Sequence, residues 1–461
     1  MSTISLMAIA QEKPLAFPGA EGYGKYTSGG RGGKIVMVTN LNNDGDGSFR
    51  KAAEARFPRT IVFAVSGTIH LESTVFIRSN ATIAGQTSPG GVCIADKSVQ
   101  LGGDNIIIQY MRFRMGDKYQ RLAGMVDGSG GEDAFGGRGR NNIMIDHCSF
   151  SWSNDEVMSV YAGDSTTIQW CLMSEPLDYS YHFEKGDTDW EHHGYGGIWG
   201  GRHLTAHHNL FAHCNNRNPR FDGIRNAPEE NVDFRNNVIY NWGSNSIYAG
   251  EGGRYNMVNN YYKYGPNTKS EVRFRIVSPG KWENPPIGFG KWFVDGNYVD
   301  GSASVSKNNW QGIAMGNKGT EEDKRESIIT SPHAFEPIHT ETAEEAFKSV
   351  IAFVGASNER DTLDQRIVLN VLNRTGKIID VQGGYPHGTP FEETTNAWPV
   401  FKSYPAPLDS DKDGIPDEWE ISNGLDSKKS MDATLFKNGF SYSNIEIYIH
   451  QLIKQHEKTN L

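Results

Sequence analysis

Short runs of apolar and β-branched residues, separated by glycine, asparagine and aspartate, occupy most of the chain before residue 340. Seven of these runs align without gaps, and they end at residues 113, 150, 173, 211, 239, 262 and 299. The steps between these ends fit a basic unit of 23 residues with insertions of 14, 15, 5 and 14. A repeat of this length is typical of a solenoid, in which each unit packs only on its neighbours.

Two columns of the alignment are apolar in every row, as expected where side chains of successive coils stack in one core. The fifth column reads Ile108, Ile145, Ile168, Ala206, Phe234, Met257 and Val294. The tenth column reads Phe113, Phe150, Met173, Phe211, Ile239, Tyr262 and Val299. The pattern predicts an all-β, right-handed parallel β-helix with coils about 4.8 Å apart. The alternative is an antiparallel β-sandwich whose spacing is accidental.

The eighth column is polar in its last four rows, which hold Asn209, Asn237, Asn260 and Asn297. Stacked in register, these amides can hydrogen-bond to one another along the solenoid axis. Asparagine also tolerates the left-handed backbone that a tight corner needs, so we expect these residues at corners. Cys148 and Cys171 occupy the same column one coil apart. Stacked buried thiols are the favoured interpretation there, and a disulfide is the alternative.

The repeat predicts a division of the chain into four parts. A leader segment covers residues 1–16, and the solenoid covers 17–300. Residues 301–400 lose the repeat but show helical spacing at 342–353 and 361–372, so we expect an irregular and helical cover that packs on the solenoid. Residues 401–461 form a small acidic extension that ends in an amphipathic run over 442–453.

Composition excludes several classes of protein. Glycine is 52 of 461 residues, about 11 % against a usual ~7 %, so turns are dense and a helical bundle is excluded. The net charge of −10 argues against non-specific nucleic-acid binding, which needs a basic surface. No apolar run approaches the roughly 20 residues of a membrane span. Four cysteines without a CxxC pair give neither a disulfide scaffold nor a zinc motif. We expect a monomer.

The N-terminus carries a weak export signal. Ala8-Ile9-Ala10 resembles the small-residue cleavage site of a secretory leader, although a basic region before it is missing. We therefore expect an exported protein, either extracellular or periplasmic. The alternative is an ordinary frayed terminus.

Insertions in a solenoid collect on one face and often build its binding groove. Asp133 and Asp155 lie beside the two long insertions and are 22 residues apart, almost one coil. Two stacked carboxylates repel unless a cation sits between them, and oxygen clusters of this kind bind Ca²⁺. Further acids near them in the repeat are Glu132, Glu156 and Asp178. The alternative to a metal site is salt bridges to Arg138 and Arg140.

Arg217 falls on the same face two coils later. It lies six residues past Phe211, whereas Asp155 lies five residues past Phe150. The expected axial offset is two coils, roughly 10 Å, which would hold a sugar ring between a cation and a guanidinium. The alternative is an ordinary surface arginine.

Several ordered motifs resemble polysaccharide lyase family 1, the pectate and pectin lyases. They are Gly19-Ala20-Glu21-Gly22-Tyr23-Gly24, Gly29-Gly30-Arg31-Gly32-Gly33, Val38-Thr39-Asn40-Leu41, Val65-Ser66-Gly67-Thr68-Ile69, Thr82-Ile83-Ala84-Gly85-Gln86-Thr87 and Ile145-Asp146-His147-Cys148. The resemblance covers residues 17–300 and implies the parallel β-helix fold. It also implies Ca²⁺ as cofactor and polygalacturonate or pectin as the partner polysaccharide.

The resemblance assigns the calcium ligands. The family's aspartate in a Gly-x-Asp-Ala stretch matches Asp133, and the next calcium aspartate matches Asp155. A further acidic ligand falls on Ser159, so its role passes to Glu156 or Asp178.

The resemblance also assigns the residues that would handle the substrate. The catalytic arginine of the Arg-x-Pro-Arg motif matches Arg217. A substrate-binding arginine falls on Asp222, so Arg220 or Arg225 takes its place. The family's substrate-binding lysine has no clear counterpart; the substitutes are Lys185 and, in the insertion, His193 and Tyr195. The implied reaction is β-elimination in polygalacturonate, which leaves a 4,5-unsaturated end. The resemblance favours Arg217 as the base that takes the C5 proton; the alternative is that Arg217 stabilises charge while hydroxide removes the proton, because a guanidinium is normally not deprotonated.

The acidic extension carries a second candidate metal site. Residues 409–420 match the pattern D-x-D-x-D-G-x₅-E of an EF-hand-like calcium loop in full. The predicted ligands are Asp409, Asp411, Asp413, Asp417 and Glu420. Gly414 occupies the turn position of such a loop. We expect this site to be structural; the alternative is a solvated acidic turn.

Three functions remain open at this point. The favoured one is a calcium-dependent pectate lyase. The second is another pectin-active enzyme on the same fold, either a pectin lyase or a galacturonan hydrolase, and a hydrolase would need paired catalytic carboxylates. The third is a non-catalytic glycan-binding solenoid. The combination of Asp133, Asp155 and Arg217 favours the first, because neither a hydrolase nor a binding module needs that arginine.

Overall fold

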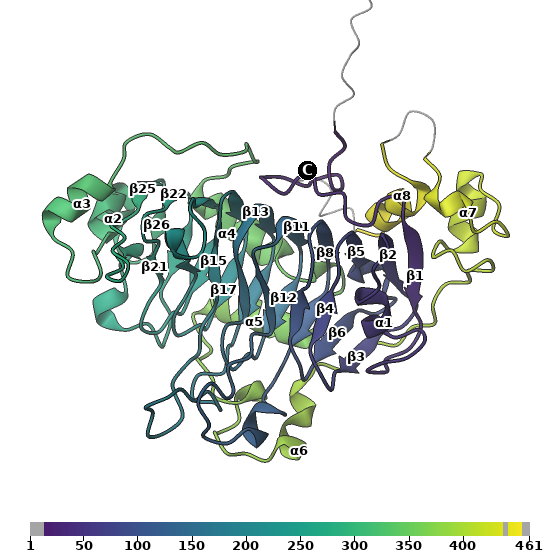
Figure 1. Ribbon diagram of the computed structural model, residues 1–461, viewed down its shortest axis with the longest axis horizontal. Coiled ribbons are helices and arrows are strands. Elements are labelled where there is room, and N and C mark those ends of the chain that lie inside the picture. The colour runs from purple at the N-terminus through teal and green to yellow at the C-terminus, as the bar shows by residue number, and fades with distance from the viewer. Residues whose placement is uncertain (1–12, 437–440, 454–461) are drawn as a thin grey trace, which may run out of the picture.

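The computed structural model describes residues 13–436 and 441–453, and their strands wind into the predicted right-handed parallel β-helix (Figure 1). One ladder contains β1 (Lys34–Val38), β2 (Arg59–Phe63), β5 (Ala81–Ala84), β8 (Ile106–Gln109), β11 (Asn141–Asp146), β13 (Met158–Gln169), β16 (Leu204–His207), β19 (Asn231–Arg235), β22 (Arg254–Val258) and β25 (Lys291–Asp295). A second ladder contains β4 (Val75–Ile77), β7 (Val99–Leu101), β10 (Phe135–Arg138), β15 (Ile198–Gly201), β18 (Arg220–Phe221), β21 (Ile247–Ala249) and β24 (Val277–Pro279). The long strand β13 joins these two ladders into one 17-stranded sheet.

A separate nine-stranded sheet forms the third side of the coil. It contains β3 (Gly67–His70), β6 (Val92–Ala95), β9 (Arg112–Arg114), β12 (Ser149–Ser151), β14 (Leu172–Ser174), β17 (Leu210–Ala212), β20 (Val238–Tyr240), β23 (Tyr261–Lys263) and β26 (Tyr298–Val299). Strands of successive coils pair in parallel in this sheet as well.

The register confirms the alignment of the seven rows. In the fifth column Ile145 pairs with Ile108 on one side and with Ile168 on the other. In the tenth column Phe150 pairs with Phe113 and Met173. The stack also begins three coils earlier than the alignment, because Val36, Ile61 and Ile83 continue the fifth column toward the N-terminus.

The asparagine ladder forms as predicted. The Nδ2 of Asn209 donates to Oδ1 of Asn237 at 2.9 Å, and Asn237 donates in turn to Asn260 at 3.1 Å. Asn260 donates to Asn297 at 2.8 Å, and the chain continues to Asn309. These side chains are almost completely buried, so the ladder satisfies amides that would otherwise be costly in the core.

The corner position was predicted one residue too late. The left-handed backbone falls on the seventh column, just before the ladder: Tyr110, His147, Trp170, His208, Asn236, Asn259 and Gly296 have φ between 50° and 68°. The ladder amides are therefore held by core hydrogen bonds, while the preceding residue turns the chain. In the early coils the corner side chains stack as rings: His147 lies 4.8 Å from Tyr110 and 5.7 Å from Trp170, between centroids.

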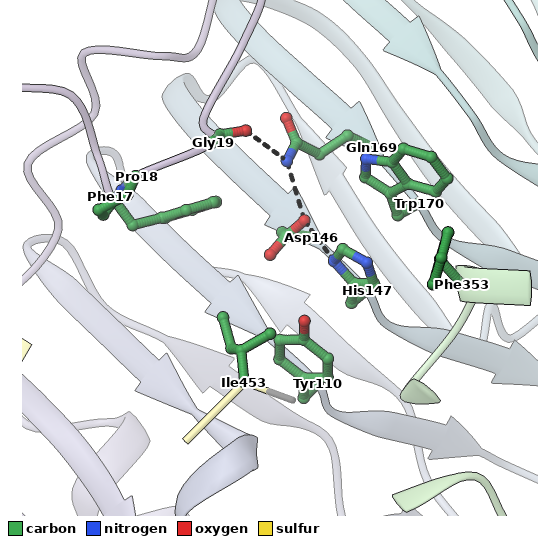
Figure 2. Close-up of a pocket in the computed structure, with 10 residues that line it drawn as sticks. All are labelled: Phe17, Pro18, Gly19, Tyr110, Asp146, His147, Gln169, Trp170, Phe353 and Ile453. Carbon is green, nitrogen blue, oxygen red and sulfur yellow. Dashed lines mark hydrogen bonds and ion pairs between the residues drawn. The ribbon is translucent and has the colours of Figure 1, made fainter. Parts of the chain in front are cut away.

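The Asp146-His147 motif belongs to this corner. Gln169 Nε2 donates to Gly19 O at 3.2 Å and to Asp146 Oδ1 at 2.9 Å, and His147 Nδ1 lies 2.7 Å from the same carboxylate (Figure 2). The network ties the N-terminal segment to the coils.

The two predicted helices cover the nine-stranded sheet. Helices α4 (Ala343–Phe353) and α5 (Thr362–Asn373) share a buried apolar cluster with Leu172, Leu210 and Val238. The shorter helices are α1 (Phe49–Ala53), α2 (Ala303–Lys307), α3 (Glu321–Ser327), α6 (Phe391–Thr394), α7 (Asp417–Asn423) and α8 (Asn444–Gln451). The 3-10 helices are η1 (Gly85–Thr87), η2 (Gln120–Leu122), η3 (Gly223–Arg225), η4 (Ser270–Val272), η5 (Asn309–Gly312), η6 (Ser357–Glu359), η7 (Gln382–Gly384), η8 (Thr395–Ala397) and η9 (Asp432–Thr434).

The C-terminal extension lies at the end of the solenoid where the chain begins, with α7 and α8 beside β1 and β2 (Figure 1). At the N-terminus, residues 1–12 of the predicted leader lie outside the described residues, and Ala16 N donates to Lys25 O at 2.6 Å.

None of the described helices is both long and apolar enough to cross a membrane. The four cysteines are buried and free, so the thiol interpretation of Cys148 and Cys171 is the one the structure shows.

Candidate active site

The segments that lead from the nine-stranded sheet to the next ladder form an open groove of about 550 Å³. Asp133 precedes β10, and Asp155 and Glu156 precede β13. His193 precedes β15, and Arg217 precedes β18. All five side chains line the groove, because the same corner of successive coils recurs on one face of the solenoid.

Three carboxylates of two neighbouring coils converge in the groove. Asp133, Asp155 and Glu156 each offer an oxygen, and these atoms lie within 4.8 Å of one another. Asp133 Oδ1 also accepts from Glu156 N at 3.1 Å, which fixes its orientation. Desolvation and the charge of Asp155 raise the pKa of Asp133. An oxygen-only set of this kind suits a hard cation such as Ca²⁺.

Of the two substitutes for the acid missing at Ser159, only Glu156 joins this cluster. Asp178 Oδ1 accepts from Gly194 N at 3.1 Å and from Asn215 Nδ2 at 2.7 Å. Its Oδ2 lies 2.7 Å from His192 Nδ1. Asp178 is therefore engaged in holding the insertion loop.

Arg217 is oriented by two neighbours. Its Nη1 forms an ion pair with Glu156, and its guanidinium carbon lies 4.4 Å from the centre of the Tyr195 ring. Bridges between Glu156 and Tyr195 and between Tyr195 and Asn216 place these residues on three successive coils. The two-coil offset was thus correct, but the arginine side chain itself spans the gap that we expected to hold a sugar.

Asp155 is also held by a pair of histidines. His193 Nε2 lies 2.7 Å from Asp155 Oδ1, and the ring stacks on His182 at 3.9 Å between centroids. Glu191 Oε2 lies 2.6 Å from His182 Nδ1 and 3.2 Å from His193 Nδ1. Although desolvation raises the pKa of Asp155, His193 and Arg217 outweigh it and lower that pKa. Although desolvation lowers the pKa of His193, the contacts with Asp155 and Glu191 raise it.

His182 and Glu191 were missed by the sequence reasoning. The signal for Glu191 was its place beside His192 and His193 in the 15-residue insertion. His182 lies in the same insertion without a motif, and its tertiary contacts with His193 and Glu191 identify it.

Three of the predicted substrate-binding residues lie elsewhere. Arg220 is buried, with Nη2 3.0 Å from Glu251 Oε1, and it also donates to Phe221 O at 2.8 Å. The Arg225 guanidinium lies 4.2 Å from the centre of the Trp282 ring. Lys185 is exposed on the insertion loop, where its backbone N donates to Asp127. In the described part of the chain, none of the three lines the groove, whereas His193 does and Tyr195 packs beneath Arg217.

The predicted tail loop brings four of its five acids together in two overlapping groups. Asp409, Asp411 and Asp413 form one, and Asp413 and Glu420 form the other with Asp432, which lies beyond the motif. Asp417 instead accepts from Ser410 N at 2.7 Å and from Ser410 Oγ at 2.6 Å. Burial and neighbouring carboxylates raise the pKa of Asp413 to about 7 and that of Glu420 to about 8.

Comparisons with known proteins agree with the motifs and the fold. No family model matches the chain. A probable pectate lyase C of Aspergillus fumigatus is 30 % identical over 470 residues, which cover 98 % of this chain and 97 % of that protein. A probable pectate lyase C of Neosartorya fischeri is 31 % identical over 472 residues, with the same coverage. The solved structure of a Bacillus subtilis pectate lyase mutant, 15 % identical, shares the fold with a TM-score of 0.50 over 76 % of this chain and 99 % of its own. Since similarity to the two fungal relatives runs almost end to end, the chain belongs to the pectate lyase family and is a polysaccharide lyase.

Proposed function

We propose that this protein is a calcium-dependent pectate lyase that cleaves (1,4)-α-D-galacturonan by β-elimination and releases 4,5-unsaturated oligogalacturonides. One observation carries the proposal: a cluster of three carboxylates and a guanidinium face the same open groove. The leader-like Ala8-Ile9-Ala10 sequence is consistent with an extracellular or periplasmic enzyme.

The groove residues fit a calcium ion by their chemistry. Asp133, Asp155 and Glu156 would hold it, because their oxygens converge from two coils. Bound there, Ca²⁺ would withdraw charge from the C6 carboxylate of a galacturonate and so acidify its C5 proton. The ion pair with Glu156 would hold the Arg217 guanidinium next to the carboxylate cluster, where a galacturonate would bind.

Arg217 is the residue we assign to the C5 proton. In β-elimination the C5–H bond breaks, its electron pair forms the C4–C5 double bond, and the C4–O4 bond breaks as O4 leaves and takes up a proton. A guanidinium is normally protonated, so Arg217 first gives a proton to solvent water in the open groove. The neutral side chain then takes the C5 proton, and water returns a proton to the leaving O4. Packing on the Tyr195 ring keeps the planar face of Arg217 fixed during this transfer.

An absorbance assay tests the proposal. Polygalacturonate treated with the enzyme and Ca²⁺ should gain absorbance at about 235 nm, where unsaturated uronates absorb, and a chelator should stop the gain. New reducing ends without that absorbance would identify a hydrolase instead. Binding without either change would identify a glycan-binding protein.

A further inference from the structure

The acidic loop in the C-terminal extension is built around a set of buried oxygens that nothing in the chain satisfies. Six carboxylate oxygens of Asp411, Asp413, Glu420 and Asp432 are buried without a hydrogen-bond partner in the described part of the chain. Glu420 has both oxygens in this state and is 0 % exposed, and Asp413 is 3 % exposed. Each unsatisfied buried carboxylate oxygen destabilises the fold, and four such groups in contact also repel one another.

The remaining acids of the loop are engaged in shaping it. Asp409 Oδ1 accepts from Lys412 N at 2.8 Å, and its Oδ2 accepts from Gly414 N at 2.9 Å. Asp413 uses its other oxygen to accept from Ile415 N at 2.9 Å. These bonds turn the loop inward and leave the six unpartnered oxygens on the acids of two overlapping groups that share Asp413.

Asp432 brings a third segment to this centre. It begins η9, 12 residues past Glu420, and its Oδ2 accepts from Asp426 N at 3.2 Å. Its Oδ1 is one of the six unpartnered oxygens, and the carboxylate lies within ligand distance of Asp413 and Glu420. The loop, α7 and η9 therefore bring carboxylates of like charge together at this point, beside the apolar cluster that contains Ile415, Trp419 and Ala433.

The same loop takes part, together with α8, in the contact between the extension and the solenoid. Ile415 is fully buried in an apolar cluster with Val62, Ala84 and Ile445. Gly414, with φ of 90°, passes so close to β1 that an added Cβ would lie 2.9 Å from Ile35. A change in the conformation of the loop would therefore alter the packing on the outer face of the first coils.

We infer that the loop binds a calcium ion in a cage of carboxylates closed by Asp432, and that this ion fastens the C-terminal extension onto the first coils of the solenoid. The two overlapping groups together offer six unpartnered oxygens, which equals the lower end of the 6–8 oxygen ligands that Ca²⁺ takes. The site shares no residue with the groove, so its role is structural.

Calcium binding to the full-length protein tests the inference. The groove site is first weakened by Asp155→Asn, so that the tail is the tighter of the two sites. This parent should bind one Ca²⁺ by titration calorimetry, and Tb³⁺ in place of Ca²⁺ should luminesce through Trp419, which lies beside Glu420 in α7. Adding Asp432→Asn or Glu420→Gln should weaken binding at least tenfold. The control Glu418→Gln removes an exposed carboxylate from the same helix and should bind as the parent does.

Limited proteolysis tests the structural role of the ion separately from calcium binding. Residues 402–408 are exposed and without regular structure, so cleavage there should be slow with Ca²⁺ and several-fold faster with a chelator. Asp432→Asn alone should be cleaved quickly even with Ca²⁺, yet should keep wild-type turnover at low temperature. The inference is overturned if the Asp155→Asn parent binds no calcium, if Asp432→Asn binds as tightly as the parent, or if chelation leaves cleavage unchanged.

Discussion

Residues of neighbouring coils determine the orientation of the Arg217 side chain in the groove. Its backbone is left-handed, with φ of 55°, and its guanidinium crosses the Tyr195 ring to reach Glu156. Sequence position placed this arginine on the correct face and two coils from Asp155. It gave no information on the side-chain direction, because Tyr195 and Glu156 belong to other coils.

Replacing Arg217 by lysine should reduce turnover by more than 100-fold, about 2.7 kcal/mol or more in the activation barrier. Lysine keeps the charge but not the planar fork that packs on Tyr195 and pairs with Glu156. Binding of oligogalacturonate should weaken far less than turnover, because the lost interaction is made mainly in the transition state. The 235 nm assay and calorimetry measure the two effects. Near-normal elimination by a folded variant would contradict the proposed mechanism.

Replacing Asp133 or Asp155 by alanine should abolish or severely reduce activity at low calcium, with partial recovery at high calcium. Each change removes one of three converging carboxylates, so the remaining two bind the ion more weakly. Activity is measured across a calcium titration, with Asp178→Asn as the matched control, since Asp178 is engaged with the insertion loop. Wild-type activity of either alanine variant at low calcium would remove the site assignment.

Helix α5 shows how a cover element is fastened to the solenoid. Arg112 and Arg114 of β9 point outward from the nine-stranded sheet and are almost fully buried beneath the helix. Arg112 Nε lies 3.0 Å from Asp361 Oδ2, and Arg114 Nη2 lies 2.8 Å from Asp364 Oδ1. Asp361 also caps α5, because its Oδ1 accepts from Asp364 N at 3.0 Å. The apolar spacing predicted this helix, but nothing local identified partners some 250 residues away.

The change Asp361→Ala should lower the free energy of unfolding by about 3–5 kcal/mol, because it leaves two buried guanidinium groups short of a partner and removes the cap. Asp361→Asn keeps an acceptor for the cap and should cost less. Urea unfolding at neutral pH measures both. Equal effects of the two changes would show that the cap contributes nothing.

The same carboxyl predicts a pH dependence. Desolvation raises the pKa of Asp361, but Arg114 and Arg112 outweigh it and lower that pKa to about 2. A folded pKa below the unfolded value of about 3.9 means that the stabilisation is fully present above that value and is lost as the pH falls toward 2. The stability difference between wild type and Asp361→Asn should therefore be constant down to about pH 5 and shrink below it. A difference that stays constant in acid would contradict the ion pairs.

One continuous apolar core runs along the inside of the stack, and a second cluster lies under the helical cover; the buried thiols lie in these two regions. Cys148, Cys171 and Cys214 lie inside the coils, and Cys93 lies under the helical cover. Burial raises the pKa of the Cys93 thiol to about 12, so the reactive thiolate is scarce there at neutral pH.

A thiol reagent should therefore label none of the four cysteines quickly in the native protein and all four after denaturation. Labelling in increasing urea should rise together with the loss of circular dichroism, since the thiols become accessible when the core opens. Counting two thiols instead of four after denaturation without reductant would indicate a disulfide between Cys148 and Cys171.

The sequence by itself determined the repeat, the inward columns and the asparagine ladder, because in a solenoid each residue contacts the equivalent residue one coil away. The same regularity located Asp133, Asp155 and Arg217 on one face, and the two cover helices followed from local apolar spacing. The motif at 409–420 likewise identified an acidic loop from contiguous residues.

Only the tertiary structure decided which groups meet inside irregular segments. Three contacts depend on the path of loops that have no repeat. Glu156 rather than Asp178 joins the carboxylate cluster, His193 contacts Asp155, and Arg220 pairs with Glu251. Asp432 reaches the tail loop from outside the motif for the same reason. In repeating coils the constant spacing determines which residues are in contact. The contacts of the insertions instead depend on packing against residues that are distant in the chain.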